Sequence, residues 1–178
     1  MDERIEENAV KFLTLLVIAL LVPFVANALE LELGLPIKRV NGVEATIVRV
    51  NSGECWNHGD GLCIYPGVLF TEVDIDGSEN VRFLGADIFA RFNGGPYWSR
   101  IGFGFGFFDR KTDEIRSAWD FNLSVQYGAR MSKSMGGYVG WEHWSNGRSF
   151  AEKLGLKSLW PDHNDGGNAF IIGIVVKI

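Results

Sequence analysis

Beyond residue 28, hydrophobic and polar residues alternate along the chain with a period of two, and no long helical periodicity appears. Such alternation is typical of β-strands, because successive side chains point to opposite faces. The clearest run places one set of residues on one face: Trp119, Phe121, Leu123, Val125 and Tyr127. Asp120, Asn122, Ser124 and Gln126 occupy the other face. We predict eight strands, at about 28–36, 43–51, 64–75, 79–92, 97–108, 115–129, 134–146 and 167–178.

The two faces of these runs indicate where the strands lie. The apolar faces are continuous and carry aromatic residues at their ends, as the lipid-facing band of an outer-membrane barrel does. The opposite faces mix charges such as Asp87 and Arg91 with glycines such as Gly102, Gly104 and Gly106, which suits a narrow lumen. Strands of roughly 9 to 11 residues match a tilted membrane crossing. We therefore predict an all-β, eight-stranded antiparallel transmembrane barrel of the outer membrane. A secreted β-sandwich is the alternative.

The N-terminal segment resembles an export signal. Residues 12–25 form an uncharged apolar run, and Ala26-Asn27-Ala28 has the form of a signal-peptidase site. The run is shorter than the roughly 20 residues of a spanning helix. Four acidic residues precede it, whereas signal peptides usually begin basic, so an uncleaved anchor is the competing interpretation. We predict a cleaved signal peptide at 1–28 and one barrel domain at 29–178.

The composition narrows the chemistry. Cys55 and Cys63 are the only cysteines, and an even number in an exported chain favours a disulfide between them. A zinc site with His58 is the alternative, although the spacing matches no common zinc pattern. The formal net charge of −5, without a basic cluster, argues against a nucleic-acid partner. We expect no metal and no cofactor.

His143 and Ser145 are the candidate catalytic residues. They are two apart on a predicted strand, so they share a face, with Cα atoms about 6.6 Å apart. A serine beside a histidine is a nucleophile beside its general base. Val139 and Trp141 lie on the same face, so the pair points outward with the apolar side chains. A hydrolytic pair on an apolar wall predicts a lipid substrate.

The last 45 residues or so resemble the PagL-type lipid A 3-O-deacylases, which are eight-stranded outer-membrane esterases. The family's H-x-S-N motif is similar to His143-Trp144-Ser145-Asn146, and its N-D-G segment is similar to Asn164-Asp165-Gly166. The resemblance implies an outward-facing triad whose acid, a glutamate in the family, falls at Asn168. An amide can orient a histidine, but it does not offset the imidazolium charge. Substitute acids in the neighbouring loop are Asp165, Asp162 and Glu152.

The resemblance also implies an oxyanion hole. Asn146 matches the family's side-chain donor, and such a donor can be worth about 3 to 4 kcal/mol of transition-state stabilisation. The family's second donor is the backbone N–H of a glycine three residues after the serine. Arg148 holds that position here, so Gly147 is the candidate. Glu142 would face the lumen by alternation.

We therefore predict an outer-membrane serine esterase that removes an ester-linked acyl chain from lipid A, with lipopolysaccharide and outer-membrane lipids as its partners. The alternative is a non-catalytic structural or adhesive barrel that has lost the triad acid. Under that alternative, His143 and Ser145 are interfacial polar residues, and Trp141 and Trp144 are aromatics of the membrane interface.

Overall fold

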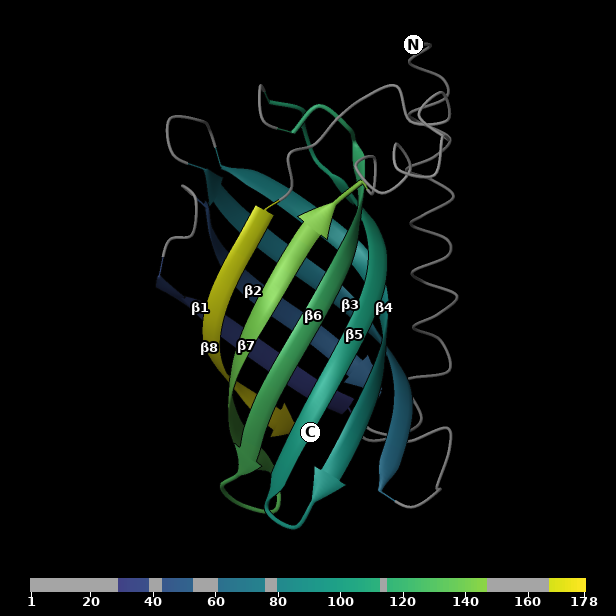
Figure 1. Cartoon of the computed structure of the whole chain (residues 1–178), viewed down its shortest axis with the longest axis vertical. Helices are drawn as coiled ribbons and strands as arrows, with labels where there is room; N and C mark the ends of the chain where they lie inside the picture. The colour runs from purple at the N-terminus through teal and green to yellow at the C-terminus, as the bar shows by residue number, and fades with distance from the viewer. Residues whose placement is uncertain (1–28, 39–42, 53–60, 76–79, 113–114, 147–166) are drawn as a thin grey trace, which may run out of the picture.

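The chain forms a closed barrel of eight antiparallel strands in a computed structural model (Figure 1). The structure describes residues 29–38, 43–52, 61–75, 80–112, 115–146 and 167–178. The strands are β1 (Leu29–Lys38), β2 (Val43–Ser52), β3 (Leu62–Ile75), β4 (Val81–Gly94), β5 (Tyr97–Phe108), β6 (Trp119–Arg130), β7 (Met135–Ser145) and β8 (Gly167–Lys177). Each pairs with its sequence neighbours, and β1 pairs with β8 to close the barrel. The predicted eight-stranded transmembrane barrel fold is confirmed, and the β-sandwich is excluded.

The barrel has two distinct ends. At the end that we call the terminal rim, Leu29 and Ile178 exchange backbone hydrogen bonds of 3.3 and 2.8 Å. The β4–β5 turn lies at this rim, and Gly95 adopts a φ of 61° there, which suits glycine. At the opposite end, the loop rim, β7 ends and β8 begins (Figure 1). The predicted signal peptide lies outside the described residues.

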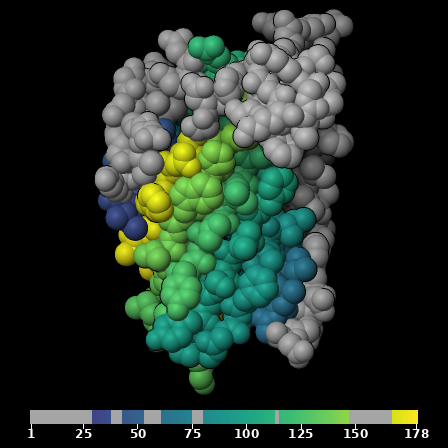
Figure 2. All heavy atoms as spheres, in the orientation of Figure 1, coloured from purple at the N-terminus to yellow at the C-terminus, as the bar shows by residue number. Residues whose placement is uncertain are grey.

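The outer wall is apolar over most of its height. Figure 2 shows β4 to β8 side by side as one continuous surface. Its large exposed side chains include Leu84, Ile88, Phe92, Ile101, Phe103, Leu123, Val125, Val139, Phe170, Ile172 and Ile174. A water-soluble protein rarely exposes so extended an apolar surface, whereas a barrel in lipid requires it. Within the described part of the chain, no helix is long and apolar enough to span a membrane.

The middle of the lumen holds a buried ionic network centred on Arg49. This side chain is 0 % exposed and donates to Glu32 and Asp87 at 2.8 Å each and to Glu142 at 3.2 Å. Arg100, also 0 % exposed, pairs with Glu32 and Gln126. Charges so far from water are tolerated only when they are paired and hydrogen-bonded. The polar faces of the strands therefore meet inside the barrel, as the alternation predicts.

Large apolar side chains also fill the lumen. Phe83, Phe89 and Trp144 are each less than 2 % exposed. The guanidinium groups of Arg49 and Arg100 lie over the Phe89 ring, at 4.7 and 4.3 Å from its centre. Glycines provide the space for this packing, since a Cβ at Gly102 would overlap the Phe89 ring. The lumen is thus a packed core.

Cys63 lies in the first residues of β3 and is disulfide-bonded. Cys55, the only other cysteine in the sequence, and His58 both lie outside the described residues.

Candidate active site on the outer wall

The strand register brings the candidate catalytic residues to one patch of the wall near the loop rim. His143 on β7 lies opposite Asn168 on β8 and, on its other side, opposite Leu123 on β6. Ser145 lies opposite Phe121. His143, Ser145 and Asn168 are all half-buried, and alternation places them on the outer face with Val139 and Phe170. The structure thus gathers the three residues on the face where the sequence predicts them.

Asn168 contacts the His143 ring directly. Its side-chain oxygen Oδ1 lies 3.1 Å from His143 Nδ1. The same oxygen accepts a hydrogen bond of 3.2 Å from the Trp141 indole Nε1. Indole N–H is only a donor, so this bond fixes which atom of the Asn168 amide faces the histidine. His143 Nδ1–H must then donate to that oxygen.

This arrangement sets the tautomer of His143. A neutral imidazole protonated at Nδ1 carries its free lone pair on Nε2. The Trp141 ring stacks on the His143 ring, with ring centres 5.6 Å apart and planes at 11°. The two contacts hold the ring with Nε2 available as a base. The sequence pattern placed Trp141 on the same face as His143, two residues before it, but it predicted neither the bond to Asn168 nor the stacking on the His143 ring.

Three neighbouring residues, Glu142, Trp144 and Asn146, are buried, and Glu142 faces the lumen as the alternation predicts. Trp144 is 1 % exposed and packs inside the barrel, so its assignment as an interfacial aromatic is wrong. Glu142 faces the lumen, where it binds Arg49 and accepts a 3.0 Å bond from Asn122. Asn146 is 1 % exposed, directly after β7. Gly147, Arg148 and the substitute acids Glu152, Asp162 and Asp165 lie outside the described residues.

An aromatic cluster lies on the wall beside Ser145. Phe121, opposite Ser145, contacts Phe103, Phe105 and Trp119, with ring centres 5.4 to 5.7 Å apart. Phe103 is 57 % exposed and Phe105 is 38 % exposed, so the cluster offers a broad apolar surface. An acyl chain can lie on such a surface without exposing polar backbone groups.

The described residues contain no cluster of three or more His, Cys, Asp or Glu side chains that could hold a metal ion. The polar groups of His143, Ser145 and Asn168 on the outer wall are an imidazole, a hydroxyl and an amide. These groups suit acyl transfer through a serine nucleophile.

Comparisons with known proteins agree on the fold. No protein-family model matches the sequence, and no curated protein matches it closely. The outer membrane enzyme PagL is similar in structure, with 18 % sequence identity, a TM-score of 0.56, and coverage of 85 % of this chain and 99 % of that one. A de novo designed transmembrane β-barrel is also similar, with 11 % identity, a TM-score of 0.55, and coverage of 85 % and 96 %. At these identities the likeness defines the class, a transmembrane β-barrel, and leaves the activity open.

Proposed function

We propose that this chain is an outer-membrane esterase that removes an ester-linked acyl chain from lipid A by a serine–histidine mechanism. One observation carries the proposal: the membrane-facing wall holds His143 bonded at 3.1 Å to Asn168, on the same face as Ser145. A site for a water-soluble substrate would have no reason to face lipid. The structural likeness to an outer membrane enzyme supports the same class of location and chemistry.

In the proposed mechanism, His143 Nε2 takes the proton from Ser145 Oγ as that oxygen attacks the ester carbonyl. The C–O bond of the tetrahedral intermediate then breaks, and His143 returns the proton to the departing sugar hydroxyl. Water, activated by the same imidazole, hydrolyses the acyl-serine and releases a fatty acid. Asn168 and Trp141 keep Nδ1 protonated throughout. Asn146 and the Gly147 backbone N–H are the proposed oxyanion donors.

A non-catalytic barrel is the second candidate. The observation that favours it is that His143 bonds to a neutral amide, which stabilises an imidazolium less than a carboxylate does. Under this proposal, the same three residues would form a polar patch at the membrane interface. The two candidates differ only in turnover.

The test is mass spectrometry of lipid A from a Gram-negative host that expresses either the wild type or Ser145→Ala. The esterase predicts loss of one acyl chain with the wild type and intact lipid A with the variant. Heat-modifiable gel migration of both proteins in the outer-membrane fraction is the control for folding and location. Unchanged lipid A with both folded proteins would refute the esterase and leave the non-catalytic barrel.

A further inference from the structure

The terminal rim of the barrel, opposite to the His143 end, holds a basic cup. Its volume is about 180 Å³, and Arg91, Arg130, Lys133 and Lys177 line it together with a single carboxylate, Glu30. Four cations against one anion contrast with the formal net charge of −5 of the whole chain. Positive charge is therefore concentrated at this rim.

Most of that charge is available to a ligand. Glu30 is bound by Arg91 through two hydrogen bonds of 2.8 and 3.0 Å. Arg91 also lies over the Trp98 ring, 4.8 Å from its centre, which fixes the floor of the cup. Arg130, Lys133 and Lys177 are exposed, and no carboxylate among the described residues pairs with any of them. Three unpaired cations converge on one opening.

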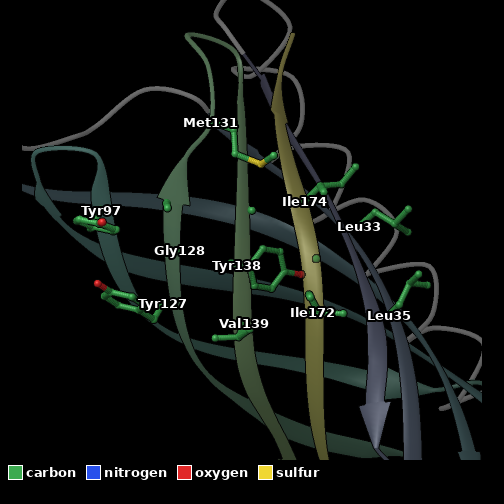
Figure 3. A pocket seen from close by; sticks show the side chains of 13 residues that line it. Leu33, Leu35, Tyr97, Tyr127, Gly128, Met131, Tyr138, Val139, Ile172 and Ile174 are labelled. Carbon is green, nitrogen blue, oxygen red and sulfur yellow. The ribbon is translucent and has the colours of Figure 1, made fainter.

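An apolar groove of about 660 Å³ runs along the outer wall at the same end (Figure 3). Leu33, Leu35, Val139, Ile172 and Ile174 form its sides, and Met131 lies at one end. Gly137 faces outward between larger neighbours and leaves the space open. On the far side, Tyr97 and Tyr127 stack at 6.2 Å and bound the groove.

The β6–β7 hairpin joins the cup to the groove. Met131 lines the groove, whereas Ser132, Lys133 and Ser134 line the cup. The hairpin is tied to β8 by a 2.7 Å hydrogen bond from Lys177 N to Ser134 O. A molecule with a negative head and an apolar chain would contact both surfaces across this hairpin at once.

We propose that the terminal rim binds one anionic phospholipid, with its phosphate among Arg130, Lys133 and Lys177 and one acyl chain in the groove. The apolar wall faces the lipid tails, and the cup opens at the level of the headgroups. Basic side chains at a membrane surface attract anionic lipids, and each buried methylene adds to the affinity. The site is separate from the proposed esterase and does not depend on it.

The test measures binding of phosphatidylglycerol to the delipidated full chain in detergent micelles by native mass spectrometry. Phosphatidylcholine and inorganic phosphate serve as the comparison ligands. The variant Arg130→Gln/Lys133→Gln/Lys177→Gln should bind phosphatidylglycerol on the order of a hundredfold more weakly, or about fivefold for each charge removed. The matched control, Arg110→Gln/Lys111→Gln/Arg116→Gln at the loop rim, should bind like the wild type.

A second variant tests the groove. In Gly137→Leu, the new Cβ would lie 3.4 Å from Met131 Sδ, an ordinary contact, so the barrel should fold. Displacing one or two methylenes of the lipid should weaken binding by about four- to fifteenfold, while any binding of inorganic phosphate should be unchanged.

Single Lys133→Gln, in an exposed turn, is the safeguard against misfolding of the triple variant and should lose about fivefold. Binding by the triple variant as tight as by its control would overturn the proposal. Displacement of the lipid by inorganic phosphate, with Gly137→Leu without effect, would also overturn it, since the cup would then hold a free anion.

Discussion

Replacing Asn168 by aspartate should make the proposed esterase faster. The substitution is isosteric, so one carboxylate oxygen can occupy the place of Oδ1, 3.1 Å from His143 Nδ1, and still accept from Trp141. A neutral hydrogen bond contributes about 0.5–1.5 kcal/mol and a charge-assisted one about 1.5–3 kcal/mol. The difference of about 1–1.5 kcal/mol, if it is expressed in the transition state where the imidazolium forms, corresponds to about a five- to tenfold gain in rate.

The same substitution should slightly destabilise the barrel. A carboxylate on the lipid side near the membrane interface costs about 0–1 kcal/mol, and Asn168 is the second residue of β8, at the loop rim. The assay compares kcat/KM for release of the acyl chain from lipid A in mixed micelles, with urea unfolding as the stability measurement. Asn168→Leu keeps the size, removes the acceptor and should be slower than the wild type by up to about tenfold. Ser145→Ala sets the background.

Two results would refute this reasoning. One is an Asn168→Asp protein that is folded and no faster than the wild type. The other is an Asn168→Leu protein with full activity, because the His143 ring would then need no acceptor at Nδ1. A fast Asn168→Asp variant of an inactive wild type would instead identify the missing charge as the reason for the inactivity.

Three further results are expected. Arg49→Met should lower the free energy of unfolding by about 3–5 kcal/mol, measured by urea titration in micelles, and adding Glu142→Gln should restore part of the loss; an unchanged midpoint would contradict the buried network. Trp141→Phe should keep the stacking on the His143 ring but remove the indole N–H that holds the Asn168 amide in one orientation. The ¹⁵N NMR spectrum of the His143 imidazole should then change from one tautomer to a mixture. A single Nδ1–H form in this variant would disprove the positioning role of Trp141. Gly102→Val should overfill the lumen and destabilise the barrel by about 1–3 kcal/mol in the same urea titration; wild-type stability would show that the lumen has spare room.

The period-two pattern was sufficient to predict the strands and the outward faces. Ile101, Phe103 and Phe105 lie outside, and the glycines between them lie inside, because a strand leaves only two directions for a side chain. The same rule placed Asn168 on the face of His143, and the register makes the two residues direct neighbours.

The period-two pattern did not predict which side chains contact one another inside the barrel or on its wall. Phe83 and Phe89 lie in the lumen, where charges and glycines were expected, because glycines on neighbouring strands create space for their rings. Trp144 shares the inward face of β7 with Glu142, and its ring fills the lumen beside Gly167 and Val43. The bond from Trp141 to Asn168 needs both a fixed register and a particular side-chain rotamer, and neither can be inferred from one sequence.

The Arg49 network has a consequence for how the barrel assembles. Its members come from β1, β2, β4, β5, β6 and β7. The three carboxylate partners of Arg49 come from β1, β4 and β7, so no single hairpin contains the complete set, and uncompensated charges in lipid are costly. Partially assembled sheets would expose those charges to the membrane interior. Insertion and closure should therefore be coupled into one cooperative step, with intermediates remaining at the water interface until the last strand pairs.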